Sequence, residues 1–185
     1  AQGIQARASA RKTKETPFMR PRTWKPMIAA VNGFALAGGW SIAQMCDLRI
    51  ASEEAKLGIS ETRWSLLPPF GAILPKQMNL ASVLELVLTA QPVTAQRAYD
   101  MGFLNKVVPA EDLMEEAMTM AQQIADNAPL AVQTFKELAY RGLNMSYQDI
   151  SALTYQMYDA LLQTEDSKEG PKAFAEKRKP QWKGR

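Results

Sequence analysis

The stretch that decides the fold is "KPMIAAVNGFALAGGWSIAQMCDLRIASEEAKLGISE", residues 25–61 of this 185-residue chain. Its first apolar run, Met27–Val31, is typical of a buried strand and ends at the turn signal Asn32-Gly33. Two later apolar runs, at 48–52 and 55–60, predict two further short strands. A helix-like run separates the first strand from the next two, and this alternation indicates an α/β fold.

Two adjacent glycines, Gly38 and Gly39, stand immediately before the helix expected over 39–46. A glycine lets a ligand approach the backbone, and the first N–H groups of a helix lack partners within the helix. The pair is therefore a candidate anion site, with Ser41 one turn further along. The alternative is that the glycines only permit a tight turn and close packing of helix on strand, and the spacing alone leaves both open.

Downstream of residue 61 the pattern turns gradually helical. We expect an apolar helical segment over 72–90, a helix over 95–101 with Thr94 as its N-cap, and a fourth strand over 104–109. Amphipathic or capped patterns then predict consecutive helices over 111–126, 129–142, 146–163 and 168–178. Four strands make a small sheet, so strands from elsewhere are expected to complete it.

Composition removes several classes of site from these residues. The sequence contains no histidine, which excludes a Ser-His-Asp or Cys-His triad and most zinc sites, and we predict no metal. The single cysteine, Cys46, cannot form an internal disulfide and is typical of a reducing compartment. No apolar run approaches the roughly 20 residues of a membrane span, and no signal peptide is recognisable.

Positive charge is concentrated at the amino-terminal end. Residues 1–26 hold seven lysines and arginines against Glu15 alone, whereas the chain as a whole has a net charge of +3. We interpret residues 1–24 as a basic loop or arm whose charges are solvated, or which helps to hold an anionic ligand. A role in binding nucleic acid, if the chain had one, would belong to this segment.

Glu61 is the candidate acid/base. It follows a short strand that is expected to be buried, and it precedes an apolar loop that contains Trp64, Leu66 and Leu67. A carboxylate partly withdrawn from water beside such residues suits proton transfer in a chain without histidine. The alternative is an ordinary surface glutamate that pairs with Arg63 or Lys56.

Residues 25–61 resemble the core of the enoyl-CoA hydratase/isomerase (crotonase) superfamily. The resemblance rests on Lys-Pro-x-Ile-Ala, on Gly-x-Ala-x-Gly-Gly, on Cys-Asp-x-Arg-Ile-Ala and on Ala-x-x-Gly followed by a glutamate. It continues in "TAQRAYDMGFLNKVVP" and in "EGPKAFAEKRKPQW", and it covers about residues 25–183.

The resemblance implies a crotonase-like spiral of ββα turns followed by a helical trimerisation region. Residues 25–110 would form the carboxy-terminal part of the spiral, and 111–185 the helical oligomerisation region. Proteins of this family normally carry about 80 further residues before the Lys-Pro motif, so the amino-terminal part of the usual fold is absent from this chain.

By the same resemblance, the N–H of Gly38 would form half of an oxyanion hole for a coenzyme A thioester, and Glu61 would be the acid/base. Trp64 is expected to bind substrate, while Phe174 and Lys177 would touch the nucleotide of a coenzyme A bound to a neighbouring subunit. Family hydratases carry a second glutamate where this chain has Ser41, so Ser41 is either auxiliary to the chemistry or simply makes hydrogen bonds at the helix start.

One glutamate suffices for some reactions of the family. We therefore expect an acyl-CoA-processing enzyme of the hydratase/isomerase type, with a hydroxycinnamoyl (feruloyl)-CoA hydratase-lyase as the close alternative. The lyase type has a similar serine after the glycines and a similar "SETRWSLLPP" segment. An alternative of another class is an RNA-binding or non-catalytic coenzyme A-binding relative.

The resemblance also predicts the partners. We expect an acyl-CoA substrate with no further cofactor, a homotrimer or dimer of trimers, and a separate amino-terminal segment that completes the fold. No membrane partner is expected, and RNA only under the last alternative. The predicted location is the cytoplasm or another reducing compartment such as the mitochondrial matrix.

Overall fold

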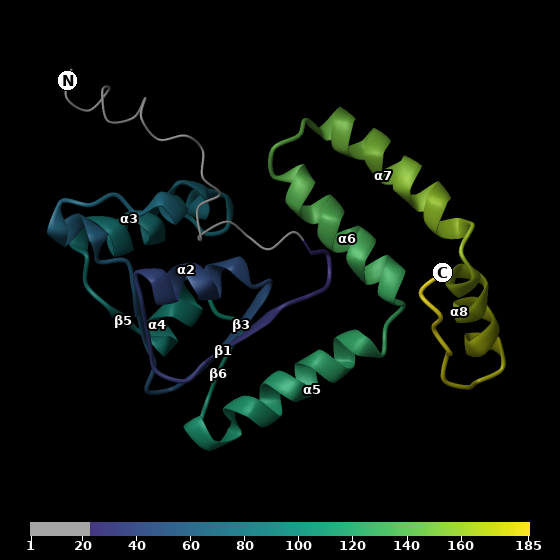
Figure 1. Ribbon diagram of the computed structural model, residues 1–185, viewed down its shortest axis with the longest axis horizontal. Helices are drawn as coiled ribbons and strands as arrows, with labels where there is room; N and C mark the ends of the chain where they lie inside the picture. Colours follow the sequence, from purple (N-terminus) through teal and green to yellow (C-terminus); the bar gives the residue numbers. More distant parts are fainter. Residues whose placement is uncertain (1–22) are drawn as a thin grey trace.

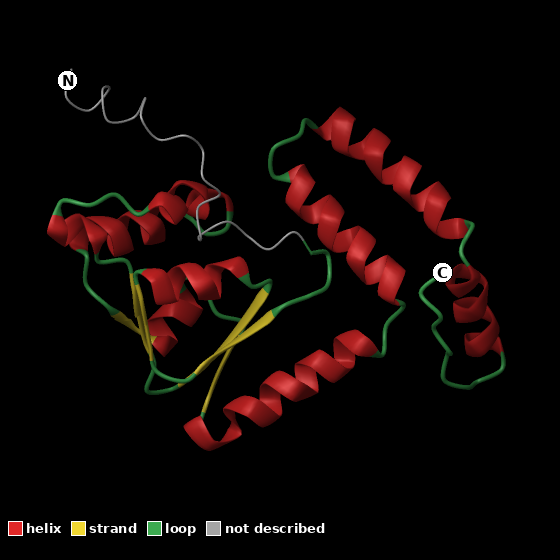
Figure 2. Ribbon diagram, viewed as in Figure 1, coloured by secondary structure: helices red, strands yellow, loops and turns green. Residues whose placement is uncertain are grey.

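The computed structural model describes residues 23–185. Two small sheets lie beside each other, with helices around them and a helical region to one side (Figures 1 and 2). The basic segment expected over 1–24 falls almost wholly outside the described residues.

The first sheet has strand order β1-β3-β6 and is parallel throughout. Its strands are Ile28–Val31 (β1), Leu48–Ser52 (β3) and Lys106–Val108 (β6). Apart from Arg49, Ser52 and Lys106 their residues are apolar, as expected for parallel strands covered on both faces. The strands predicted over 27–31, 48–52 and 104–109 are thus confirmed, with the third shorter than expected.

The second sheet has strand order β2-β4-β5, in which β2 pairs with β4 in parallel and β4 with β5 in antiparallel fashion. Its strands are Phe34–Leu36 (β2), Lys56–Gly58 (β4) and Val93–Thr94 (β5). Only β4 was expected from the sequence. Strands β2 and β5 are so short that their residues show no clear period.

The chain repeats one order: a strand of the first sheet, a strand of the second sheet, and then a helical segment. After β1 and β2 comes α2 (Gly38–Met45), and after β3 and β4 come a 3₁₀ turn (Glu61–Trp64) and further helical structure. Figure 2 shows the two sets of strands with helices packed beside them. The repeated strand–strand–helix order is the spiral expected from the sequence.

The helix expected over 72–90 is divided. A 3₁₀ segment occupies Pro69–Lys76, and α3 (Leu80–Thr89) begins only after Asn79, whose side chain accepts a hydrogen bond from the Ser82 N–H. The division was not predicted, although the polar residues Lys76, Gln77 and Asn79 mark it in the sequence. Helix α4 (Ala95–Asp100) begins at the Thr94 cap, as predicted, because the Thr94 hydroxyl accepts the Arg97 N–H.

The rest of the described chain is helical. Its helices are α5 (Leu113–Ala125), preceded by a 3₁₀ turn (Ala110–Asp112), α6 (Pro129–Gly142), α7 (Tyr147–Leu162) and α8 (Glu165–Ala175). Helix α5 packs Leu113 and Ala117 against Ile50 of the first sheet, while α6, α7 and α8 extend away from the sheets (Figure 1). The expected starts and ends agree to within three residues.

No helix among residues 23–185 combines the length and the apolar character that a bilayer crossing requires. The same part of the chain contains no group of three acidic, cysteine or histidine side chains arranged to hold a metal ion.

Candidate active site

Strands β2 and β4 bring the candidate residues to one edge of the second sheet. The two strands are parallel, with Leu36 opposite Gly58, and the Ala37 N–H donates to the Gly58 carbonyl at 3.0 Å. The carboxyl ends of parallel strands meet at the same edge of a sheet. Helix α2 and the Glu61 turn therefore start beside each other, although 22 residues separate Gly39 from Glu61.

The first turn of α2 has no side-chain cap. Its N-cap residue is Ala37, whose side chain cannot accept a hydrogen bond. Helices α5 and α6 also lack a side-chain cap, whereas Asn79, Thr94, Ser146 and Thr164 cap α3, α4, α7 and α8. Gly38 and Gly39 are the first two helical residues and are half-buried. Their N–H groups carry the positive end of the helix dipole to this edge.

Ala37 itself adopts an unusual backbone conformation, with φ of 50° and ψ of −112°. A residue other than glycine at positive φ costs of order 1–3 kcal/mol, and such strain is concentrated at functional sites. The conformation turns the chain sharply from β2 into α2. The sequence contains no signal for this residue, because alanine is not typical of such a turn.

The roll of α2 about its axis is fixed by Trp40, which is fully buried. Its ring stacks on Phe103 with centroids 3.9 Å apart, and its Nε1–H donates to Gln44 Oε1 at 3.2 Å. The Gln44 amide in turn donates to the Phe70 carbonyl at 3.1 Å. These contacts set the rotation of α2 about its axis.

Ser41 lies one turn inside α2, with 1% of its surface exposed. Its N–H makes the first helical hydrogen bond, to the Ala37 carbonyl, but its hydroxyl oxygen is buried and has no partner among the described residues. The hydrogen bond at the helix start that we considered for this hydroxyl is therefore not formed. A buried hydroxyl without a partner is rare and calls for a ligand or a water.

Glu61 opens the 3₁₀ turn that follows β4. Its Oε2 atom is buried and accepts no hydrogen bond from the part of the chain that is described. Two neighbours tie the turn to α3: the Thr62 hydroxyl donates to the Val87 carbonyl at 2.6 Å, and the Arg63 guanidinium donates to the Ala90 carbonyl at 3.2 Å. The Arg63 side chain thus binds a backbone carbonyl. Within residues 23–185, Glu61 forms no ion pair with Arg63 or Lys56.

The apolar residues after Glu61 are not packed over it in this chain. Trp64, Leu66 and Leu67 are 70%, 60% and 83% exposed. The predicted partial withdrawal of the carboxylate from water agrees with its buried Oε2 atom, but these three side chains are largely exposed to solvent. The turn ends at Ser65, which has a left-handed conformation. Trp64 shares a turn with Glu61, but its ring faces solvent.

Phe174 and Lys177, the residues expected to touch the nucleotide of coenzyme A, lie away from the edge of the second sheet that holds Gly38 and Glu61. Phe174 is in the last turn of α8 and is 87% exposed, and Lys177 follows it at φ of 54°. Figure 1 shows α8 at the far side of the helical region from α2. One chain therefore places the start of α2, with Gly38 and Ser41, and the turn of Glu61 and Trp64 at the same edge of the second sheet, and leaves the other two residues apart.

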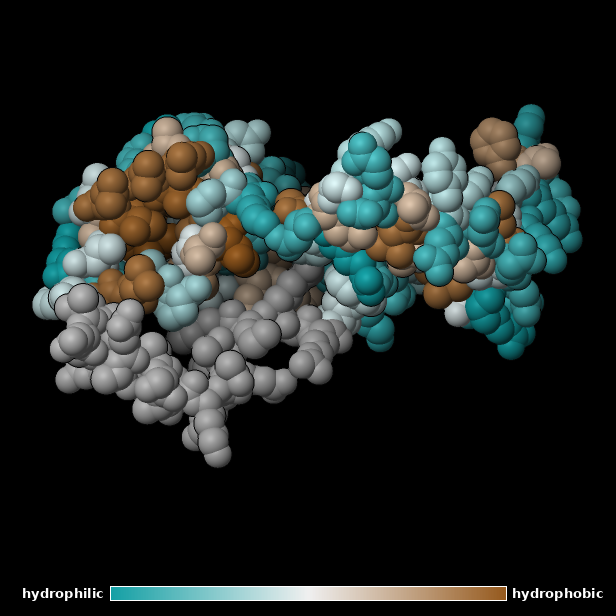
Figure 3. Space-filling model, turned by 90° about the horizontal axis from the view of Figure 1, so that it is seen from above, coloured by the Kyte–Doolittle hydropathy of each residue, from teal (hydrophilic) through white to brown (hydrophobic). Residues whose placement is uncertain are grey.

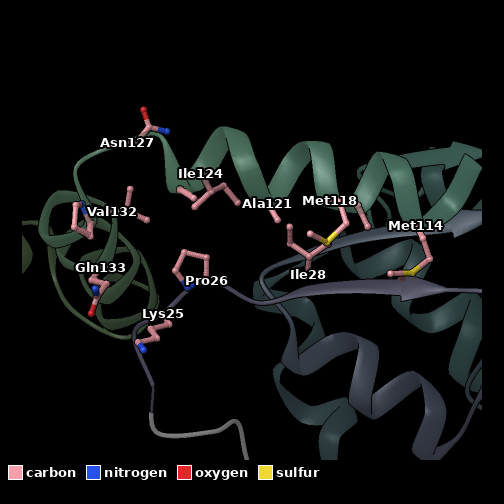
Figure 4. A pocket seen from close by; sticks show the side chains of 14 residues that line it. Lys25, Pro26, Ile28, Met114, Met118, Ala121, Ile124, Asn127, Val132 and Gln133 are labelled. Atoms are coloured by element: carbon pink, nitrogen blue, oxygen red, sulfur yellow. The ribbon is translucent and has the colours of Figure 1, made fainter. Parts of the chain in front are cut away.

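A separate apolar groove of about 510 Å³ runs between β1, α5 and the start of α6 (Figure 4). Its walls include Ile28, Met114, Met118, Ala121 and Ile124. Strand β1 pairs only with β3 among the described strands, so the groove lies along an open sheet edge. It contains no acidic residue and is distinct from the Glu61 site.

Comparison with known proteins agrees with this architecture. The family model described as enoyl-CoA hydratase/isomerase matches residues 3–185. A carnitinyl-CoA dehydratase from Proteus mirabilis is 40% identical over 168 residues, which cover 87% of this chain and 64% of that protein. The chain therefore spans slightly less than two thirds of the length of this relative.

Solved structures of enoyl-CoA hydratases are similar to this chain in fold and sequence. An enoyl-CoA hydratase from Bacillus anthracis superposes with a TM-score of 0.85 at 37% identity, over 89% of this chain and 64% of that one. An enoyl-CoA hydratase from Mycobacterium tuberculosis gives a TM-score of 0.87 at 32% identity, over 98% of this chain and 75% of that one. The chain belongs to the enoyl-CoA hydratase/isomerase family and has its crotonase fold.

Proposed function

We propose that the complete protein processes an acyl-CoA thioester through an enolate, with the first turn of α2 as oxyanion site and Glu61 as acid/base. The observation that carries the proposal is the meeting of an uncapped helix start and a glutamate with a buried, unpartnered oxygen at one sheet edge. Family membership supplies the thioester as substrate class.

The proposed chemistry is proton transfer next to a carbonyl. The thioester oxygen accepts the Gly38 N–H, and Glu61 removes a proton from the adjacent carbon, whose electron pair moves to the oxygen as negative charge. That charge is stabilised by the helix start, where losing one such donor costs roughly 2.7–4 kcal/mol of barrier. Glu61 then returns a proton. No electron is gained or lost, so we propose no cofactor beyond the coenzyme A of the substrate.

The reaction that follows the enolate is proposed as hydration, dehydration or double-bond isomerisation. The relatives named carnitinyl-CoA dehydratase favour the loss or gain of water. Ser41 cannot act as a carboxylate base at neutral pH, so we assign to it the holding of a water or substrate hydroxyl. A hydroxycinnamoyl-CoA hydratase-lyase, in which the enolate arises by the breaking of a carbon–carbon bond, is the alternative within the family.

We further propose that the site is completed by chains outside this one. Phe174 and Lys177 are exposed and remote from Gly38, which suits contact with a coenzyme A held by a neighbouring subunit of a trimer or of a dimer of trimers. Strands β1 and β2 each have one unpaired edge among the described residues, which suits an amino-terminal segment that adds strands to both sheets. The location proposed is a reducing compartment, where Cys46 stays a free thiol.

A panel of substrates tests the proposal. The complete protein should turn over at least one of crotonyl-CoA, a 3-enoyl-CoA, a 3-hydroxyacyl-CoA and hydroxycinnamoyl-CoA, and the product identifies the reaction. Binding of coenzyme A without turnover of any of the four would instead support the non-catalytic relative. Binding of RNA at physiological salt would support the RNA-binding alternative, whose basic segment lies outside the described residues.

A further inference from the structure

A buried polar cluster joins α6 to the loop that follows α2. The carboxylate of Asp47 accepts hydrogen bonds from the Met27 N–H at 2.7 Å and from the Tyr140 hydroxyl at 3.0 Å, and it pairs with the Lys136 ammonium at 2.7 Å. The side chains of Lys136 and Asp47 are only 7% and 13% exposed. Three separate parts of the chain therefore meet at one carboxylate.

The Lys136 ammonium has a second acceptor, the carbonyl of Lys25, directly before β1. Charges withdrawn from water need partners, and the two charges of this cluster find them on α6, on the segment before β1 and on the α2–β3 loop. Figure 4 shows Lys25 and Pro26 beside Val132 and Gln133 of α6, at the end of the apolar groove. The cluster thus fixes α6 to both loops.

Asp47 is directly connected to α2, because it follows Cys46, the C-cap residue of that helix. Its own N–H donates to the Met27 carbonyl at 2.9 Å, so its backbone and side chain are both held. Helix α2 has eight residues and a length of about 12 Å, and a helix this short moves as a rigid element. We therefore expect a shift at Asp47 to be transmitted to Gly38 at the other end.

At the Gly38 end, α2 makes fewer hydrogen bonds to the rest of the fold. The turn into α2 is tied to β4 by the single backbone bond from Ala37 to Gly58, and the helix start has no cap. The stack of Trp40 on Phe103 fixes the roll of the helix but lies along its side. The partners of the Asp47 carboxylate are thus among the contacts that hold α2 along its axis, together with the bond from Gln44 to the Phe70 carbonyl and that from Arg49 to the Cys46 carbonyl.

We propose that Lys136 and Tyr140 are positioning residues: acting through Asp47, they hold α2 so that its first-turn N–H groups stay aimed at the ligand carbonyl. The identity of that ligand rests on the proposed function, whereas the hold on α2 does not. The helical region therefore contributes to the oxyanion site of its own chain, in addition to any contact with a neighbouring subunit.

Three variants of the complete protein separate positioning from simple stability. Lys136→Met leaves the Asp47 carboxylate buried without its cation, so both stability and turnover should fall. Lys136→Met combined with Asp47→Asn removes both charges, so the melting temperature should recover toward that of the parent. Positioning is not restored in this double variant, and its kcat should stay about ten- to a hundredfold low with KM changed less than about threefold.

The matched control lies on the same helix. Arg141 and Glu137 form an ion pair one turn along α6, with the Arg141 side chain 52% exposed. Arg141→Met should leave kcat within about twofold of the parent. Lys136→Arg keeps a cation at the cluster and should recover part of the kcat lost in Lys136→Met.

Hydrogen exchange supplies a readout that does not depend on catalysis. The amides of residues 41–45 in α2 should exchange at least about tenfold faster in the double variant than in the parent. In Arg141→Met, their exchange rates should equal those of the parent. Parental kcat together with parental exchange in the double variant would overturn the proposal. If the parent turns over no acyl-CoA, the proposed function fails, and the exchange rates alone decide whether the cluster positions α2.

Discussion

At the scale of single residues, two buried serine hydroxyls pose the same physical problem in different places. Ser41 and Ser52 are each 1% exposed, and neither hydroxyl has a partner among the described residues. Ser41 lies in the first turns of the helix proposed to bind the thioester, whereas Ser52 ends β3 in the first sheet. A buried, unpaired hydroxyl costs about 1–3 kcal/mol, so an explanation is needed for each.

The matched variants Ser41→Ala and Ser52→Ala should separate a functional hydroxyl from a merely buried one. Each removes an unpaired polar atom, so each should leave the free energy of unfolding unchanged or raise it by about 1 kcal/mol in urea titrations. Only Ser41→Ala should lower turnover, by about tenfold, because it also removes a hydrogen bond to water or substrate. Full turnover in Ser41→Ala would contradict the role assigned to this hydroxyl.

Two residues of the proposed site were predicted from the sequence, and their roles stay predictions. The family motifs led to Gly38 and Glu61, and the structure brings both to one sheet edge. The exposure of Trp64 and the strained backbone of Ala37 could not be predicted, because both depend on how the chain leaves a strand. Neither the direction of an exit nor a positive φ at alanine has a sequence signature.

At the scale of elements, α2 distinguishes the two interpretations of the glycine pair. A Cβ built on Gly39 would meet only the Phe34 carbonyl oxygen at 3.8 Å and the Ala35 Cβ at 3.9 Å. These are ordinary van der Waals distances, so close packing of helix on strand does not require glycine at position 39. The packing interpretation therefore has no support at this residue.

The variant Gly39→Ala tests that conclusion directly. Alanine is favoured over glycine in helices by up to about 1 kcal/mol, so the free energy of unfolding should stay the same or rise by up to that amount. Urea denaturation followed by circular dichroism provides the measurement. A loss of more than about 1 kcal/mol would mean that the packing of α2 needs glycine after all.

Helix α8 and the chain end after it are joined by an ion-pair network. The Arg178 guanidinium donates two hydrogen bonds to Glu169, and the Gln181 N–H adds a third. These hydrogen bonds lower the pKa of Glu169 from 4.5 to about 2, and the bonds from Arg178 have the largest effect. The carboxylate thus stabilises the fold while ionised.

The network should make the end of the chain sensitive to acid. Because the pKa is lowered on folding, the contribution of Glu169 is complete above about pH 4.5 and is lost as the pH falls toward 2. Thermal melts of Glu169→Gln should show lower stability than the parent at pH 7 and a smaller decline between these two pH values. A decline as steep as that of the parent would contradict the assignment.

The long amphipathic elements were the easiest to predict. Helix α6 begins and ends where the sequence placed it, since Pro129 suits a first helical turn. The carboxy-terminal helix starts at Glu165 rather than 168, because the Thr164 hydroxyl caps it by accepting the Ser167 N–H. The sequence interpretation overlooked this cap, just as it overlooked the Asn79 cap that divides the segment before α3.

At the scale of the whole molecule, the described chain leaves much apolar surface uncovered. Figure 3 shows an apolar patch over the side of the molecule that carries α3. Exposed residues of α3 and the preceding 3₁₀ segment include Ile73, Leu80, Leu84 and Leu88. The helical region adds exposed aromatic residues, namely Phe135, Tyr147, Tyr155, Tyr158 and Phe174. Surface of this kind marks contacts with other chains or segments.

The complete protein should therefore be an assembly. Burial of these side chains between subunits would account for their exposure in one chain, and we expect sedimentation at micromolar concentration to show a trimer or a hexamer. A monomer under these conditions would contradict the proposed contribution of Phe174 and Lys177 to a neighbouring site. Assembly could not be predicted from the periodicity of the helices, since the apolar face of a helix does not reveal its partner.

The central claim is that Glu61 moves the proton next to the thioester carbonyl, and the exchange of that proton with solvent tests it most directly. The complete protein is incubated with an acyl-CoA in D₂O, and deuterium at the carbon beside the carbonyl is followed by mass spectrometry. Glu61→Gln should slow this exchange by roughly 10²–10⁴-fold while Ser52→Ala exchanges at the parental rate. Exchange at the parental rate in Glu61→Gln would contradict the account.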